Sequence, residues 1–291
     1  MLRYLETEDS PQRAAHCKHL LDVSYRWLYQ VSESTQQIML GQTYKVGERE
    51  VDISLQMRQF QKQKYSIAPE MMLPKPKQGV CFDVTEVQVR NETTLMTARE
   101  LVKAGKRPLV LNFANGTHVG GGFLRGARAQ EETLCYASSL YATLVGDAFY
   151  TYNQQFPAVS SDYAILSKAV VFKDDQYQLI EEPWTMDVLT AAAPIAKERW
   201  GGVSQLEGAR IMDQRIARVL DIAIAYGYSS LVLGAWGCGA FGNDPVLIAK
   251  LFEKHLKQRC SHFETVHFAI SDWSRERRFL RPFAEQFSSI Q

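Results

Sequence analysis

The chain has 291 residues, a length that fits one large domain or two small ones, because single hydrophobic cores stop growing at about 250–300 residues. Hydrophobic residues make up 46% of the chain and charged residues 22%, which excludes a disordered or fibrous protein. The formal net charge of +1 argues against a protein that holds long nucleic acid through phosphate contacts. We therefore expect no direct DNA binding and only a small nucleotide ligand.

The sequence predicts a soluble, intracellular protein, most simply a cytoplasmic one. It contains no run of about 18 apolar residues, and its amino terminus, MLRYLETEDS, lacks the basic-then-apolar order of a secretion signal. Five cysteines without CxxC spacing argue against a disulfide framework. Two groups combine histidine and cysteine: His16, Cys17 and His19, and His255, Cys260 and His262. Neither has the spacing of a zinc site, so we expect no metal.

The first 77 residues predict an N-terminal helical extension. Apolar residues recur there at three- and four-residue intervals between positions 10 and 40, as on amphipathic helices. The following segment 62–79, KQKYSIAPEMMLPKPKQG, is rich in lysine and proline and is expected to be a connector. We accordingly divide the chain into an extension, 1–77, and a domain, 78–291. The extension is expected to be a brace, with a surface that recognises a modified protein as the alternative.

Short apolar runs alternate with longer helical patterns in the second part. Strands are expected at 108–114, 164–173, 186–195, 230–237 and 265–270. Helices are expected at 92–105, 130–146, 205–227 and 245–258. This alternation indicates an α/β fold in which helices cover both faces of a sheet.

Two glycine-rich segments follow predicted strands: NGTHVGGG, ending at residue 122, and GAWGCGAFGN, 234–243. Open α/β sheets bind ligands outside the carboxyl ends of their strands. Glycine lets a ligand approach the main chain, and successive N–H groups bind phosphate oxygens. Neither segment matches the P-loop or the dinucleotide fingerprint. We expect a diphosphate between the two loops, with simple tight turns as the alternative.

Gln130, Glu131 and Glu132 stand at the start of the next predicted helix. A carboxyl group beside a sugar diphosphate can protonate a glycosidic oxygen. Adjacent helical residues point about 100° apart, so the two glutamates should have different roles. The helix start favours the ionised form, which works against a general acid, so burial or neighbouring negative charge must compensate. An isolated pair of this kind would also fit helix capping.

The segment NFANGTHVGGGFLRGARAQEETLCYASSLY resembles the signature of the poly(ADP-ribose) glycohydrolases, especially the short microbial type, in which about six to eight residues separate GGG from QEE. Here seven residues separate them, and the resemblance extends from about residue 80 to the end. It implies a macrodomain-like three-layer α/β/α sandwich with a mixed central sheet, preceded by helices. It implies hydrolysis of ribose glycosidic bonds in poly(ADP-ribose), with release of ADP-ribose and no separate cofactor.

The resemblance also implies roles for individual residues. Glu132 is the expected catalytic acid and base, Glu131 holds ribose hydroxyls, and Gln130 supports their turn. The further substrate-binding residues that it implies are Asn115, Gly120, Gly121, Gly122, Gly237, Cys238, Gly239, Ala240, Phe241 and Asp83. Phe241 is expected to pack on the terminal ribose. Asp83 or Asn91 is the expected adenine contact, with a turn residue at a strand edge as the alternative reading of Asp83.

Three other functions share parts of this pattern. A Cys238 nucleophile with His118 as base is disfavoured, because a nucleophile elbow has glycines two residues away on each side and those of Cys238 are adjacent. A hydrolase that removes a single ADP-ribose from a protein side chain stays open. So does a non-catalytic ADP-ribose-binding macrodomain. The expected partner is an ADP-ribose polymer or an ADP-ribosylated protein, with no membrane partner, and the sequence does not decide the oligomeric state.

Overall fold

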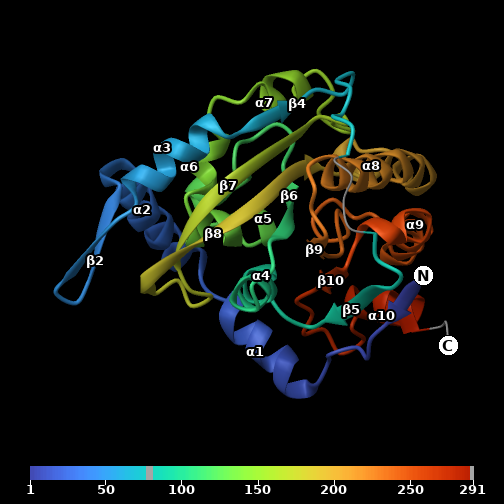
Figure 1. Ribbon diagram of the computed structural model, residues 1–291, viewed down its shortest axis with the longest axis horizontal. Coiled ribbons are helices and arrows are strands. Elements are labelled where there is room, and N and C mark those ends of the chain that lie inside the picture. The colour runs from blue at the N-terminus through green and yellow to red at the C-terminus, as the bar shows by residue number, and fades with distance from the viewer. Residues whose placement is uncertain (77–80, 289–291) are drawn as a thin grey trace.

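The computed structural model describes residues 1–76 and 81–288, and its centre is a mixed β-sheet. The strands of this sheet are β1 (Leu2–Tyr4), β4 (Tyr65–Ile67), β5 (Thr85–Arg90), β6 (Pro108–Ala114), β7 (Ala164–Lys173), β8 (Leu179–Ala192), β9 (Ser230–Leu233) and β10 (Thr265–Ala269). Within the described residues their order is β1-β5-β10-β9-β6-β8-β7-β4 (Figure 1). Neighbours from β1 to β8 are parallel, whereas β7 runs antiparallel to both β8 and β4.

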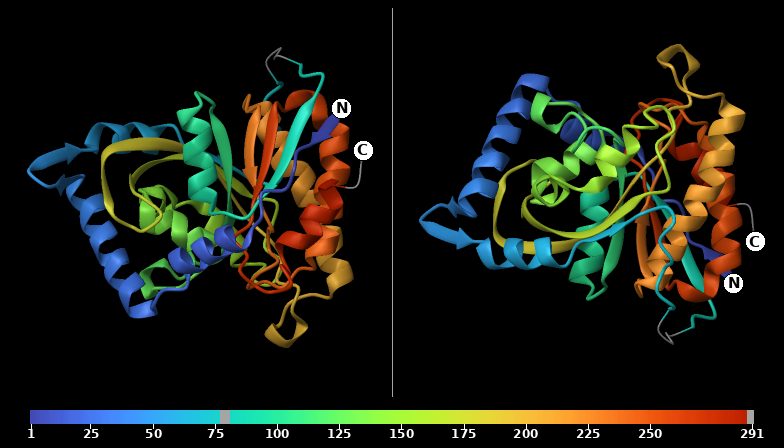
Figure 2. Two further views of the ribbon diagram at one scale, coloured as in Figure 1. Left: turned by 90° about the horizontal axis from the view of Figure 1, so that it is seen from below. Right: turned by 90° about the horizontal axis from the view of Figure 1, so that it is seen from above.

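Helices cover both faces of the sheet (Figure 2). One face carries α2 (Tyr25–Gly41), α3 (Ser54–Lys62), α4 (Thr94–Lys103), α5 (Gln130–Ala137), α6 (Leu140–Leu144) and α7 (Ala148–Asn153), and α1 (Pro11–Leu21) leads into α2. The other face carries α8 (Gln205–Ala225), α9 (Pro245–Arg259) and α10 (Leu280–Ser288). A separate hydrophobic cluster fills each interface. The predicted three-layer α/β/α sandwich with a mixed sheet is therefore confirmed.

The central strands match the expectation closely, because they are apolar on both faces. Six of the seven residues of β6, PLVLNFA, are buried, as expected for a parallel strand covered on both sides. The expected strand 164–173 has the bounds of β7. The expected strand 186–195 is wrong at both ends, since β8 begins at Leu179 and ends at Ala192. β5 was missed, because its sequence TEVQVR alternates polar and apolar residues and contains no apolar run.

The single helix expected at 130–146 is wrong, because α5 and α6 are separate helices. Ser138, between them, has extended backbone angles, φ −145° and ψ 175°, and forms a bridge with Val171 of β7. Ser138 Oγ donates to Leu134 O at 2.7 Å, and Ser139 Oγ accepts from Val170 N at 2.9 Å. These serine side chains replace the helical hydrogen bonds that are lost at the break.

The amino-terminal segment is more than a helical extension. Its helices α1 and α2 span residues 11–41 and so match the expected helical range, 10 to about 40. However, β1 and β4 are the two edge strands of the central sheet, and a hairpin of β2 (Thr43–Val46) and β3 (Arg49–Asp52) follows α2. β4 falls inside the expected connector, where the sequence Tyr-Ser-Ile pairs with β7 before the first proline. The expected boundary at residue 77 lies outside the described residues, so the division into two domains stays a prediction.

None of the helices in the described part of the chain is both long enough and apolar enough to cross a lipid bilayer.

Candidate active site

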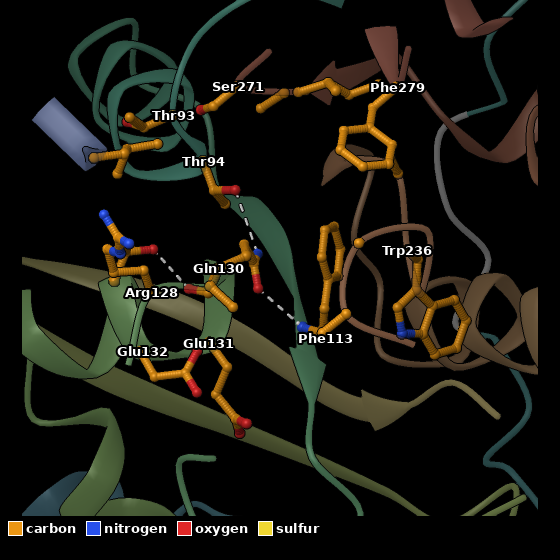
Figure 3. Close-up of a pocket in the computed structure, with 18 of the residues that line it drawn as sticks. Thr93, Thr94, Phe113, Arg128, Gln130, Glu131, Glu132, Trp236, Ser271 and Phe279 are labelled. Atoms are coloured by element: carbon orange, nitrogen blue, oxygen red, sulfur yellow. Dashed lines mark hydrogen bonds between the residues drawn. The ribbon is translucent and has the colours of Figure 1, made fainter. Parts of the chain in front are cut away.

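The carboxyl ends of β6, β9 and β10 open onto a cavity of about 620 Å³ (Figure 3). This volume is in the range of small-molecule sites, about 300–1,000 Å³. The cavity is lined by residues from the strand ends, the following loops, α5 and the corner between α1 and α2: Leu21, Asp22, Tyr25, Leu28, Thr93, Thr94, Phe113, Ala114, Asn115, Arg128, Ala129, Gln130, Glu131, Glu132, Thr133, Tyr136, Tyr177, Ala193, Ala235, Trp236, Gly237, Gly239, Ala240, Phe241, Ala269, Ile270, Ser271, Trp273 and Phe279. The site therefore lies at the edge of the sheet that the glycine loops predicted.

Gln130 fixes the start of α5 to the sheet. Its Oε1 accepts a hydrogen bond from Phe113 N at 2.9 Å, and its Nε2 donates to Leu111 O at 2.8 Å and to Thr94 Oγ1 at 3.3 Å (Figure 3). The side chain thus joins α5 to β6 and to the first turn of α4. This is a supporting position, and Gln130 also lines the cavity.

Glu131 is nearly inaccessible to solvent, with a relative exposure of 2%. Its Oε2 accepts from Asn115 N at 2.8 Å, and its Oε1 accepts from Asn112 Nδ2 at 3.3 Å. Burial raises the pKa of this carboxyl well above its ordinary value despite these two donors. The protonated form of Glu131 is therefore favoured much more than in water.

Glu132 is buried as well, with a relative exposure of 7%, but it is only half satisfied. Oε1 accepts from Gly122 N at 2.7 Å, whereas Oε2 is buried and has no hydrogen-bond partner in the described part of the chain. Burial raises the pKa of Glu132, against the lowering effect of the N–H groups at Gly122 and the helix start. Burial is thus the compensation that a general acid at a helix start requires. A buried oxygen without a partner at a cavity is also the place where a ligand hydroxyl would bind.

The GGG triplet packs against these carboxylates and not against the cavity. Gly121 has φ +58°, and a Cβ on it would clash with Glu132 Oε1 and lie 3.0 Å from Glu131 Oε2. The N–H of Gly121 donates to His118 O at 3.0 Å, and that of Gly122 donates to Glu132. Gly120 lies against Tyr141. None of the three glycines is among the described residues that line the cavity, so an open anion-binding nest at this triplet is not what the structure shows.

The second loop does reach the cavity. Gly237, Gly239, Ala240 and Phe241 line it, and within the described chain the N–H groups of Gly239, Ala240 and Phe241 donate to no other group. Gly239 and Ala240 are exposed. Three successive unused N–H groups in the connection from β9 to α9 form the kind of nest that binds a diphosphate.

Cys238 is the residue of this loop that does not line the cavity. Its side chain is buried, its Sγ lies 3.7 Å from Trp236 O, and burial raises the pKa of the thiol far above its usual range. A buried neutral thiol is a poor nucleophile. His118 is exposed, lies outside the cavity lining and contacts Thr117 Oγ1 through Nδ1 at 2.9 Å. The structure therefore does not support direct contact between Cys238 and a ligand. Nor does it support Cys238 as a nucleophile with His118 as its base.

Asp83, an expected adenine contact, does not lie at the cavity. It is exposed, precedes β5 at the amino edge of the sheet, and its carbonyl oxygen accepts from the amino terminus at 2.6 Å. Asn91 follows β5 at the correct edge, but it is buried and its Nδ2 donates to Asp9 Oδ1 and Asp272 O, both at 2.8 Å. Neither residue lines the cavity, because the strand direction puts Asp83 at the wrong end and internal hydrogen bonds occupy Asn91.

Sequence reasoning missed the aromatic wall of the cavity. Phe113, Trp236 and Phe279 lie together on one side, and Trp236 Nε1 is buried without a partner in the described chain (Figure 3). Phe113 lies just before the first glycine segment and Trp236 lies inside the second, so the sequence did offer a signal for both. Phe279 comes from the carboxyl-terminal loop before α10, and nothing local in the sequence connects it with the site.

Sequence reasoning also missed the opposite wall, which the corner between α1 and α2 supplies. Asp22 and Tyr25 line the cavity there together with Arg128, which follows the glycine triplet.

As to metal sites, the described residues contain no group of three His, Cys, Asp or Glu side chains arranged to hold an ion. His255 Nε2 instead contacts Asp213 Oδ1 at 2.6 Å.

The protein is an α/β sandwich with a mixed central sheet, and its cavity lies at the carboxyl edge of that sheet. Two buried glutamates stand beside the cavity, behind a glycine loop. This arrangement defines a class of α/β protein with a carboxylate site for a nucleotide-sized ligand. The family model "microbial-type PARG, catalytic domain", where PARG denotes poly(ADP-ribose) glycohydrolase, matches residues 32–174. No curated protein sequence matches the chain.

Solved structures are similar over nearly the whole length. Poly(ADP-ribose) glycohydrolase from Thermomonospora curvata is 33% identical, with a TM-score of 0.81 over 90% of this chain and 99% of that one. The same enzyme bound to the inhibitor ADP-HPD is 35% identical, with a TM-score of 0.79 over 90% and 99% of the two chains. The enzyme from Deinococcus radiodurans in complex with ADP-ribose is 29% identical, with a TM-score of 0.72 over 84% and 99%. This chain belongs to the microbial-type poly(ADP-ribose) glycohydrolase family.

Proposed function

We propose that the protein hydrolyses the ribose glycosidic bonds of poly(ADP-ribose) and releases ADP-ribose. The observation that carries this proposal is Glu132, a buried carboxyl group on the cavity wall with a raised pKa and one oxygen without a partner. Membership of the family supports it, as do the solved relatives that bind ADP-ribose or ADP-HPD.

The cavity offers a complementary surface to each part of ADP-ribose. The diphosphate accepts hydrogen bonds from the unused N–H groups of Gly239, Ala240 and Phe241. Adenine stacks in the aromatic wall, against Phe113 and Phe279, because purine bases bind partly exposed aromatic rings. The terminal ribose then extends toward α5, where Asn115 and the two glutamates lie, and Phe241 of the cavity wall packs on it.

The two glutamates divide the chemistry. Protonated Glu132 gives its proton to the leaving ribose oxygen as the bond from that oxygen to the anomeric carbon breaks through an oxocarbenium-like state. Ionised Glu132 then takes a proton from the water that adds to the anomeric carbon, which restores the acid. Glu131, fixed by Asn115 N and Asn112 Nδ2, holds the ribose hydroxyls. No step in this scheme requires a cofactor.

Two broader assignments belong to the same proposal. We assign the fold to the macrodomains, on the grounds that a glycine loop and a carboxylate turn meet at the carboxyl edge of a mixed sheet. We also assign the protein to the cytoplasm, a location supported by five cysteines that are all unpaired.

The experiment that tests the function measures ADP-ribose release from automodified polymer and from a mono-ADP-ribosylated protein, with ADP-ribose binding followed by calorimetry. We expect rapid release from the polymer and micromolar or tighter binding. Release only from the mono-modified protein would make the enzyme a side-chain hydrolase. Binding without release from either substrate would make it a non-catalytic reader.

A further inference from the structure

The cavity continues past Glu132 to a second wall that the roles assigned above do not use. Arg128 and two residues at the corner between α1 and α2, Asp22 and Tyr25, line this end. Figure 3 shows Arg128 and Glu132 on one side of Gln130, and Trp236 and Phe279 on the other. The unassigned wall is therefore opposite the aromatic wall.

Tyr25 and Arg128 form a preassembled stack. The guanidinium carbon of Arg128 lies 4.6 Å from the centre of the Tyr25 ring. Arg128 Nη1 donates to Asp22 Oδ1 at 3.0 Å and to Val23 O at 3.1 Å, which holds the guanidinium in place. Even so, Tyr25 is 58% exposed and the Arg128 side chain 35% exposed. An exposed aromatic ring and a guanidinium plane, already ordered, are a surface on which a nucleobase stacks at little entropic cost.

The stack is fixed relative to the catalytic carboxyl group. Gly126, in the segment between GGG and QEE, has φ +77°, and a Cβ there would clash with Tyr25 O. The segment before α5 is thus docked directly on the first turn of α2. Arg128 precedes Gln130 by only two residues, and Gln130 is tied to the sheet. The platform and Glu132 therefore keep one relative geometry.

The covalent structure of poly(ADP-ribose) determines which part of the substrate lies beside Tyr25 and Arg128. In poly(ADP-ribose) the leaving oxygen is the 2′-oxygen of the adenosine ribose of the next unit, so an adenine base lies one ribose away from the scissile bond. The diphosphate of the terminal unit lies on the side of the Gly239–Phe241 loop, so the next unit leaves Glu132 on the side of Tyr25. Asp22 offsets much of the charge of Arg128, which makes the surface better suited to a neutral base than to a phosphate.

We propose that Tyr25 and Arg128 form a second substrate-binding site, which stacks the adenine of the ADP-ribose unit on the leaving side of the scissile bond. The inference rests on the proposed polymer hydrolysis. It gives the amino-terminal helices a direct part in substrate recognition, beyond bracing the sheet.

The test compares two substrates: an ADP-ribose dimer, and the same dimer with the adenine of its leaving unit removed. Both release the same terminal ADP-ribose by breaking the same type of bond. For the wild type, removal of the adenine should lower kcat/KM about 5- to 150-fold, the factor that stacking of one base contributes. Tyr25→Ala should lower kcat/KM for the intact dimer by a similar factor and leave that for the truncated dimer unchanged.

Controls separate this site from a structural effect. Tyr29, one turn further along α2, is 46% exposed and lies outside the cavity lining, so Tyr29→Ala should behave as the wild type on both substrates. Tyr25→Phe, which keeps the ring, should keep the preference for the intact dimer over the truncated one. ADP-ribose affinity should be unchanged in all three variants.

Two outcomes would overturn the inference. An equal fall of kcat/KM on both dimers in Tyr25→Ala, or no fall on either, would contradict the second site while leaving the polymer hydrolase in place. A wild type that cleaves neither dimer would instead contradict the proposed function, and the second site with it.

Discussion

At the residue scale, the active site depends on a glycine that never touches the cavity. Gly121 combines a left-handed backbone with van der Waals contact to both carboxyl groups. A Cβ at this position would meet Glu132 Oε1 directly and would push that carboxyl group away from Gly122 N, the one group among the described residues that donates a hydrogen bond to it. The conformational freedom of glycine and the space it leaves are both needed here.

We predict that Gly121→Ala lowers kcat/KM on poly(ADP-ribose) by at least about 100-fold, because small displacements of catalytic groups have effects of that size. The strained backbone should also lower the free energy of unfolding by about 1–3 kcal/mol. Kinetics and denaturant unfolding check the two effects. Gly105→Ala is a matched control, since Gly105 has φ +76° but open space around it. If both variants lost activity equally, backbone strain alone would explain the effect.

The aromatic wall provides a second test at this scale. Phe279 is partly exposed, lines the cavity and is held by Phe279 N donating to Asp272 Oδ2 at 2.7 Å. We predict that Phe279→Ala weakens ADP-ribose binding about 5- to 150-fold through loss of base stacking. Calorimetry measures the change. Phe156→Ala, which removes a phenyl ring that is 42% exposed outside the cavity, should leave the affinity unaltered, and an unaltered affinity for Phe279→Ala would place adenine elsewhere.

Prediction from sequence succeeded where chemistry was local and failed where it was not. Gln130, Glu131 and Glu132 are adjacent in sequence, so their spacing from GGG was enough to predict that they belong to the candidate site. Tyr25 and Arg128 are about a hundred residues apart in sequence, and only the packing of α2 on the segment before α5 brings them together. Asp83 failed for another reason: its place on the amino side of β5 depends on strand direction, which composition does not reveal.

At the scale of the elements, a buried lysine connects the sheet to two helices. Lys173, the last residue of β7, donates from Nζ to Thr35 Oγ1 at 2.7 Å and to Val31 O at 3.2 Å, both on α2. Thr35 Oγ1 in turn donates to Tyr136 O of α5 at 2.7 Å. The chain of hydrogen bonds holds the helix that carries both glutamates against α2 and β7.

This lysine predicts a pH dependence of stability. Burial lowers the pKa of Lys173 from 10.5 to about 8. Between these two values the unfolded chain holds a proton on Lys173 that the folded chain has released, so the contribution of Lys173 to the free energy of unfolding rises as pH increases. The buried thiols of Cys17, Cys135 and Cys238, whose pKa values burial raises, contribute in the opposite direction. The full gain is about 3 kcal/mol at most.

Denaturant unfolding at intervals from pH 7.5 to 10.5 measures this gain. The contribution of Lys173 is the difference between the profile of the wild type and that of Lys173→Met, and this difference should grow as pH rises. Lys45→Met, which removes an exposed lysine of the hairpin, should have the wild-type profile. Identical pH profiles for the wild type and Lys173→Met would show that the ammonium group is not desolvated.

The elements themselves were predictable in proportion to their burial. Central strands such as β6 are apolar on both faces and stand out in the sequence. Edge strands β1 and β4 are only three residues long, and their pairing with distant strands decides their conformation. The break between α5 and α6 depends on serine hydrogen bonds to β7, a tertiary effect that helical periodicity hides.

At the scale of the whole molecule, the first 76 residues complete the fold. They supply both edge strands of the sheet, and α2 and α3 contribute to the hydrophobic cluster on the face that carries α5. We predict that a chain beginning at residue 81 shows no cooperative unfolding and aggregates. Removal of the amino-terminal segment uncovers β5, β7 and a large apolar surface. Circular dichroism and size-exclusion chromatography check this. A stable, monomeric, active fragment would instead establish the extension as a separable domain.

The proposed role of Glu132, catalytic acid and base of a poly(ADP-ribose) glycohydrolase, is best tested with Glu132→Gln. The amide can still accept from Gly122 N through its oxygen but carries no transferable acid proton. The measurement is ADP-ribose release from poly(ADP-ribose) by the wild type and the variant, with ADP-ribose affinity determined on the same samples. We predict a loss of release of at least about 1,000-fold with affinity within about threefold of the wild type. Release within about tenfold of the wild-type rate would contradict the account.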